Sequence, residues 1–113
     1  MTDAARFAGR TAIVTGAASG IGRATALRFA SEGAAVGCLD VADGVDETVA
    51  EIIAAGGRAV AARVNVSDES SVADAVASVR AELGPITILA NVAGVLRFAI
   101  THEASVSDFE LML

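Results

Sequence analysis

Three glycines in residues 15–22, TGAASGIG, have a spacing typical of a loop that binds phosphate. Gly16 lets the chain turn sharply, and Gly20 leaves no side chain between the backbone and a pyrophosphate. Gly22 lets the helix that follows lie close to the preceding strand. Because the N-terminus of a helix carries unpaired N–H groups and a partial positive charge, the segment predicts a pyrophosphate-binding turn.

Two hydroxyl side chains, Thr15 and Ser19, lie within this turn and are candidate donors to the phosphates. A P-loop is excluded, because its mechanism requires a lysine after the second glycine, where this chain has Ile21. A glycine-rich turn without a ligand is the alternative interpretation. The apolar stretch before the turn and the helical pattern after it favour a binding site.

A second candidate binding group is Asp40, which follows Gly22 by 18 residues and ends an apolar stretch. About 20 residues beyond a glycine turn, a carboxylate accepts hydrogen bonds from the ribose hydroxyls of adenosine. It also repels a 2′-phosphate, and neither Ser19 nor Val41 is an arginine that could receive one. These features favour NAD over NADP, with an ordinary loop aspartate as the alternative.

Residues for acid–base or metal chemistry are few. All eight basic residues are arginine, and the chain has no lysine, tyrosine or tryptophan. His102, the only histidine, has no nucleophile at a suitable spacing, and Cys38 lies within an apolar stretch. Histidine, cysteine and acidic residues nowhere have the spacing of metal ligands. The sequence therefore predicts a binding site without a catalytic residue or a metal.

The composition excludes several other classes of protein. The net charge is −6 and the arginines are scattered, which argues against a nucleic-acid partner. No apolar stretch reaches the roughly 20 residues of a membrane span, and the N-terminus does not resemble a secretory signal. A single cysteine indicates a cytoplasmic protein without internal disulfides.

The elements that must position the candidate residues alternate regularly. Short apolar strands are predicted at 11–15, 34–40, 58–66 and 86–90, separated by helices at 20–32, at 44–55 and from Ser67 or Asp68 to Leu83. This β-α-β-α-β-α-β order requires right-handed crossovers and a parallel sheet. We therefore predict one α/β domain over residues 1–113, with a Rossmann-like doubly wound sheet of strand order 3-2-1-4, truncated after the fourth strand and the start of the next helix.

With these residues identified, the chain resembles the classical short-chain dehydrogenase/reductase family. TGAASGIG matches the family's Thr-Gly-x-x-x-Gly-x-Gly turn, and residues 91–94, NVAG, occupy the place of its Asn-Asn-Ala-Gly motif. Asn65 and Val66 lie where the family has an Asp-Val pair. Asn65 thus replaces an aspartate and Val92 replaces an asparagine, and we expect neither change to abolish binding.

The resemblance implies that residues along the whole chain hold the cofactor. The pyrophosphate and the adjoining ribose would be lined by Gly16, Ser19, Gly20 and Ile21, the adenosine ribose and adenine by Asp40, Val41, Asn65 and Val66, and the nicotinamide ribose by Asn91, Ala93 and Gly94. Asn91 would also tie the fourth strand to its neighbours.

The same resemblance implies an Asn–Ser–Tyr–Lys catalytic group that this chain lacks. The 113 residues would then be the cofactor-binding half of a longer protein, inactive alone. The parent would be an NAD-dependent oxidoreductase, a homodimer or homotetramer, that moves a hydride between NAD and an alcohol or carbonyl substrate. A catalytically silent NAD-binding module or partner subunit is the alternative. A methyltransferase is a third interpretation, which the NVAG motif disfavours.

Overall fold

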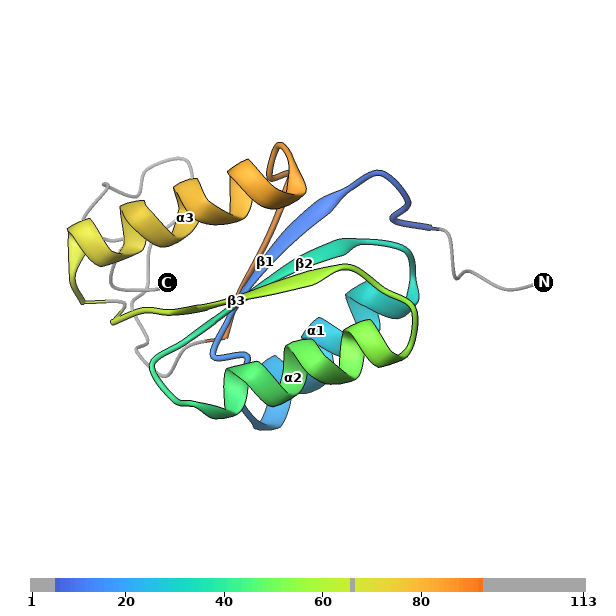
Figure 1. The fold of residues 1–113 in the computed structure, drawn as a ribbon, viewed down its shortest axis with the longest axis horizontal. Coiled ribbons are helices and arrows are strands. Elements are labelled where there is room, and N and C mark those ends of the chain that lie inside the picture. Colours follow the sequence, from blue (N-terminus) through green and yellow to red (C-terminus); the bar gives the residue numbers. More distant parts are fainter. Residues whose placement is uncertain (1–5, 66, 93–113) are drawn as a thin grey trace.

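The computed structural model describes residues 6–65 and 67–92, which form a parallel sheet between helices (Figure 1). The strands of this part of the chain are β1 (Thr11–Thr15), β2 (Ala35–Asp40), β3 (Ala59–Arg63) and β4 (Ile88–Asn91). Its helices are α1 (Gly20–Ser31), α2 (Gly44–Ala54) and α3 (Glu69–Leu83). The strand order β3-β2-β1-β4, with every neighbouring pair parallel, confirms the predicted α/β fold.

Two strands, β3 and β4, differ from their predicted limits by two residues or more at one end. β3 ends at Arg63 and not at residue 66, because β2 ends at Asp40, the register partner of Arg63. Beyond that point one further N–H, that of Val64, reaches the Asp40 carbonyl oxygen at 3.0 Å. β4 starts two residues later than predicted and includes Asn91, which pairs with the last residue of β1.

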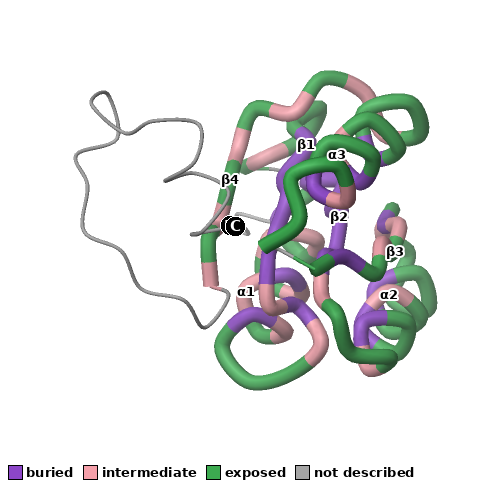
Figure 2. Tube along the Cα trace, turned by 90° about the vertical axis from the view of Figure 1, so that its left-hand side faces the viewer, coloured by how far each residue is buried: buried purple, intermediate pink, exposed green. Residues whose placement is uncertain are grey.

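The helices divide the core into two parts. Figure 1 shows α1 and α2 on one face of the sheet and α3 on the other. Alternate residues of a strand face opposite sides, so Val14 packs under α1 and α2 whereas Ile13 packs under α3. The central strands β1 and β2 are buried, while residues of β4 are intermediate or exposed (Figure 2). This burial explains why the central strands are continuously apolar.

The ends of the helices have local chemical causes. Asp68, and not Ser67, caps α3, because its Oδ1 accepts hydrogen bonds from the Ser70 and Ser71 N–H groups at 3.0 and 3.2 Å. The bond from the Ser71 N–H contributes most to lowering the pKa of the Asp68 carboxyl. Gly33 follows α1 with a φ of 98°, as expected for a residue that stops a helix.

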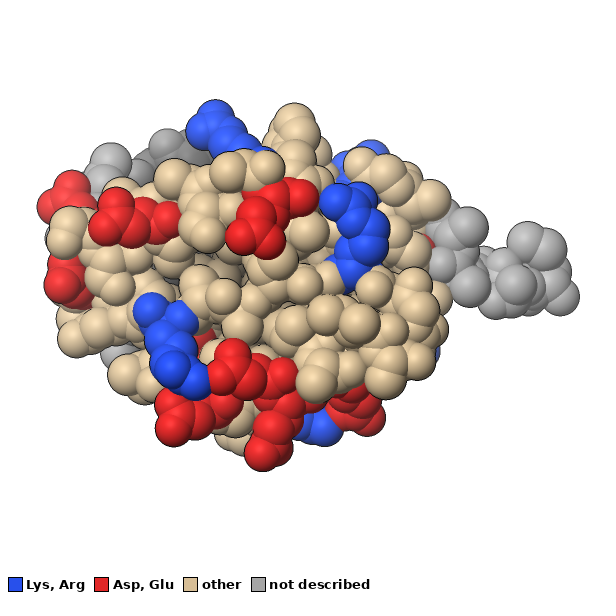
Figure 3. Space-filling model, viewed as in Figure 1, with Lys and Arg blue, Asp and Glu red and all other residues tan. Residues whose placement is uncertain are grey.

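Acidic residues outnumber basic ones in the chain, 14 to 8. On the face drawn in Figure 3, acidic side chains gather in several groups, and basic side chains are fewer and separated. Among the described residues, no helix has both the length and the apolar character that crossing a bilayer requires.

Cys38 is buried in the centre of β2, and burial raises the pKa of its thiol to about 12. We expect no reaction of the folded chain with a thiol reagent at pH 8, and full reaction in denaturant. The folded thiol keeps its proton between about pH 9 and 12 while the unfolded thiol loses it, so stability should fall as pH rises above 9. Urea unfolding at pH 8 and pH 10 measures this loss of stability, with a Cys38→Ala variant for comparison. Equal pH dependence of the two unfolding free energies would contradict the prediction.

Candidate cofactor-binding site

The glycine turn joins the carboxyl end of β1 to the N-terminus of α1. Gly16 and Gly20 have φ values of 66° and 59°, in the left-handed region that favours glycine. Ser19 precedes α1 in an extended conformation, is exposed, and makes no side-chain hydrogen bond to the helix. The helix therefore begins at the turn with its first N–H groups unpaired within the helix.

Two glycines of the turn have different surroundings. A Cβ on Gly22 would lie 1.9 Å from the Gly16 carbonyl oxygen, so the first turn of α1 packs directly on the glycine turn. A Cβ on Gly20 would have no heavy atom within 4 Å. Gly22 is thus required for packing, whereas Gly20 presents open backbone at the helix N-terminus. This open backbone fits the approach of a pyrophosphate.

Asp40, the last residue of β2, binds the backbone of the glycine turn. Its Oδ2 accepts a hydrogen bond from the Ala18 N–H at 2.9 Å, and its Oδ1 accepts one from the Ala42 N–H at 3.1 Å. The Ala17 N–H also donates to the Leu39 carbonyl oxygen at 3.2 Å. The carboxylate is therefore fixed between the glycine turn and the start of α2.

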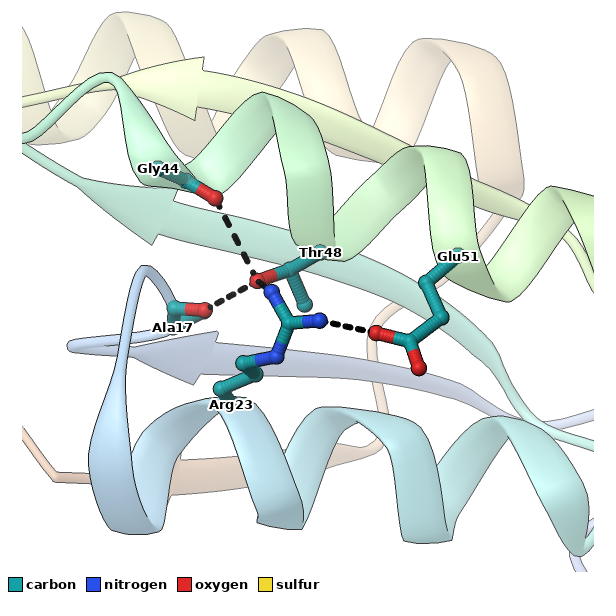
Figure 4. A network of polar contacts seen from close by, with 5 residues as sticks. All are labelled: Ala17, Arg23, Gly44, Thr48 and Glu51. Atoms are coloured by element: carbon teal, nitrogen blue, oxygen red, sulfur yellow. Dashed lines mark hydrogen bonds and ion pairs between the residues drawn. The ribbon is translucent and has the colours of Figure 1, made fainter.

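Thr48 on α2 hydrogen-bonds to the glycine turn, and the sequence analysis did not identify this residue. Figure 4 shows its hydroxyl between the turn and Arg23 of α1. The Thr48 hydroxyl is buried and donates to the Ala17 carbonyl oxygen at 2.8 Å. A terminal nitrogen of Arg23 donates to the Thr48 hydroxyl oxygen at 3.5 Å, and the Arg23 guanidinium forms an ion pair with Glu51. The available signal was a polar residue on the stripe of α2 between Val45 and Ile52, both of which are buried.

Replacing Thr48 by valine preserves the shape of the side chain and removes the donor. We expect the Thr48→Val variant to lose about 1–3 kcal/mol of unfolding free energy, because the Ala17 carbonyl loses its partner. Urea denaturation measures the loss. Thr48→Ser keeps the hydroxyl and should lose less than Thr48→Val; the opposite order would show that the methyl group, and not the hydrogen bond, stabilises the turn.

Thr15 does not serve as a phosphate donor, contrary to the hypothesis from the sequence. Its hydroxyl is fully buried, donates to the Asn91 Oδ1 at 3.1 Å, and accepts from the Val92 N–H at 2.9 Å. Asn91 therefore ties β4 to β1, as the family resemblance implied. The side chains link the carboxyl ends of two neighbouring strands.

The remaining candidates lie around the same end of the sheet. Ile21 and Val41 are 75% and 72% exposed, which is unusual for large apolar side chains and suits contact with a planar ligand. Asn65 follows β3 and its Oδ1 accepts from the Ser67 N–H at 3.0 Å. An amide oxygen has two lone pairs, so the oxygen of Asn65 can accept one more hydrogen bond.

Several candidates cannot be placed. Val66, Ala93, Gly94 and His102 lie outside the described residues. Within residues 6–65 and 67–92, no group of three or more histidine, cysteine or acidic residues could hold a metal ion.

The architecture of the site defines its class. A glycine turn at a helix N-terminus, a carboxylate at the end of the neighbouring strand and a parallel sheet of order 3-2-1-4 are the parts of a dinucleotide-binding Rossmann domain. A sequence profile described as short chain dehydrogenase matches residues 10–113. The chain belongs to the short chain dehydrogenase family, whose members use NAD(P).

Similar proteins agree with this assignment. The chain is 46% identical over 108 residues to cis-4-hydroxycyclohexanecarboxylate dehydrogenase of Sinomonas cyclohexanicum, covering 95% of this chain and 43% of that protein. It is 39% identical over 103 residues to 2,3-dihydro-2,3-dihydroxybenzoate dehydrogenase of Bacillus subtilis, covering 90% and 40%. The crystal structure of a dehydrogenase/reductase from Sinorhizobium meliloti superposes with a TM-score of 0.78 at 41% identity, covering 96% of this chain and 44% of that one.

A further solved structure contains a cofactor. A blue fluorescent protein from a metagenomic library, in complex with NADPH, has a TM-score of 0.74 and 32% identity, and the match covers 94% of this chain and 44% of that one. The chain thus spans less than half the length of the relatives that it matches.

Proposed function

We propose that residues 1–113 form the cofactor-binding part of an oxidoreductase that moves a hydride between NAD and an alcohol or carbonyl substrate. The observation that carries the proposal is the position of Asp40, hydrogen-bonded to the Ala18 N–H beside the N-terminus of α1. This places a fixed carboxylate next to open backbone N–H groups. The two features suit the ribose and the pyrophosphate of one dinucleotide.

The proposed preference is for NAD. Asp40 would accept hydrogen bonds from the ribose hydroxyls and would repel the 2′-phosphate of NADP. Ser19 in the glycine turn and Val41 directly after Asp40 supply no positive charge. NAD would supply the hydride acceptor, and the residues of this chain would bind and orient it: Gly20 at the pyrophosphate, Asp40 at the adenosine ribose and Asn91 at the nicotinamide ribose.

We also propose that the 113-residue chain binds NAD without turning it over. The sequence contains neither a tyrosine that could act as the general acid nor a lysine that could lower its pKa. The names of the Sinomonas and Bacillus relatives describe hydroxylated six-membered rings, which supports a ring alcohol as substrate of the full protein.

Titration of the 113-residue chain into NADH, followed by nicotinamide fluorescence, tests the proposal. The chain has no tryptophan or tyrosine, so protein emission is low. We expect NADH to bind at least about tenfold more tightly than NADPH, a difference of ~1.4 kcal/mol. No binding of NADH, or tighter binding of S-adenosylmethionine, would refute the proposal. Turnover of NAD with secondary alcohols by this chain would refute its proposed inactivity.

A further inference from the structure

Arg63 lies beside Asp40 in the sheet, although 23 residues separate them in the sequence. The two residues are register partners at the carboxyl ends of β3 and β2. Register partners in a parallel sheet project from the same face, with their Cβ atoms about 5 Å apart. The strand register therefore places Arg63 next to Asp40, the carboxylate of the proposed ribose site.

Two further carboxylates hold this arginine. Arg63 Nε lies 3.0 Å from Asp43 Oδ1, and a terminal nitrogen of the guanidinium forms an ion pair with Asp46. Asp43 is the residue before α2, and Asp46 lies in the first turn of that helix. The Arg63 side chain is 53% exposed, so its guanidinium lies at the surface and could contact a bound ligand.

The negative charges around Arg63 are unfavourable for binding a 2′-phosphate, which requires positive charge. The guanidinium of Arg63 pairs with the carboxylates of Asp43 and Asp46, and Asp40 lies beside Arg63 on the neighbouring strand. An arginine receives a phosphate through paired N–H donors. In Arg63, Nε and one terminal nitrogen are already directed to carboxylates.

We propose that the Arg63 guanidinium is suited to bind a 2′-phosphate and that its ion pairs with Asp43 and Asp46 prevent this binding. These ion pairs then help determine which dinucleotide binds. The proposal rests on the proposed function, and it assigns the preference for NAD to two acids of α2 in addition to Asp40. Neutralising these two acids frees the guanidinium for the 2′-phosphate of NADP.

The test measures NADH and NADPH affinity in variants of the 113-residue chain. Exposed ion pairs contribute little to stability. The Asp43 side chain accepts no capping hydrogen bond from the N–H groups of α2, so Asp43→Asn with Asp46→Asn should leave the fold intact. We expect this double variant to bind NADPH about tenfold more tightly, the effect of one charge-assisted pair. Unfolding midpoints verify that the variants are folded.

Two controls separate a freed arginine from the loss of negative charge. Adding Arg63→Ala to the double variant should return NADPH affinity to about the original value. Glu47→Gln removes one charge from the neighbouring exposed position of α2 and should change the NADPH-to-NADH ratio by less than Asp46→Asn does. The inference is overturned if the double variant gains no NADPH affinity, or if the gain persists after Arg63→Ala is added. In either case, NADH binding by the original chain still upholds the proposed function. Failure of the original chain to bind NADH refutes both.

Discussion

The Gly22→Ala variant is expected to lose about 3 kcal/mol or more of unfolding free energy, and with it the folded glycine turn. The added methyl group would lie 1.9 Å from the Gly16 carbonyl oxygen and 2.5 Å from its carbonyl carbon. Both atoms belong to the backbone, so no side-chain rotation can relieve the overlap. Either α1 moves away from the sheet or the turn changes its conformation. Urea denaturation followed by circular dichroism measures the loss.

Gly20→Ala is the matched control, two residues away in the same turn. Its methyl group meets no atom within 4 Å, and the substitution is strained only by the φ of 59°. We expect a loss of about 1–2 kcal/mol from this strain. The folded Gly20→Ala variant should nevertheless bind NADH more weakly, because the methyl group projects from the backbone where the pyrophosphate is proposed to lie. Equal stability of the two variants would contradict the assignment of Gly22 to packing and Gly20 to binding.

The second large effect is expected at Asp40. Asp40→Ala should weaken NADH binding by about 10–100-fold, because the ribose hydroxyls lose a charged acceptor. The same change removes the repulsion of a 2′-phosphate, so the preference for NADH over NADPH should nearly disappear. The Ala18 N–H also loses its acceptor, which should lower the denaturation midpoint.

Direct titration with both reduced cofactors measures the effect of Asp40→Ala. Asp74→Ala is the control, since Asp74 is exposed on α3, which covers the opposite face of the sheet from α1 and α2. This control removes the same charge from the molecule and should leave both affinities within about twofold. Equal effects of the two substitutions would show that net charge, and not the position of Asp40, governs binding.

The sequence predicted the fold well because each element has its own local cause. The central strands are apolar runs, the helices carry apolar stripes, and Gly33 and Asp68 mark helix ends by backbone conformation and capping. The predicted end of β3 was wrong because a strand ends where its partner ends. Val64 and Val66 extend the strand-like pattern past Arg63, but β2 ends at Asp40, the register partner of Arg63.

The glycine turn and Asp40, which the sequence singled out, lie together in the structure through the bond from the Ala18 N–H to Asp40. What the sequence missed depends on tertiary contacts. Gly16, Gly20 and Asp40 follow recognised spacings in the chain. Thr48 supports the turn from 31 residues away, and Arg63 reaches Asp40 through strand register. Neither relation is visible until the elements are packed. The hydroxyl of Thr15 was misassigned for the same reason, since Asn91 is 76 residues distant.

The contact between Thr15 and Asn91 also bears on the entropy of ligand binding. Through it, the strand that leads into the proposed pyrophosphate turn and the strand that leads to the proposed nicotinamide end are fixed relative to each other before any ligand arrives. A ligand that spans both strands then has less chain to immobilise, so more of its contact energy contributes to affinity. One buried hydroxyl group thus sets the spacing of a two-part site in advance.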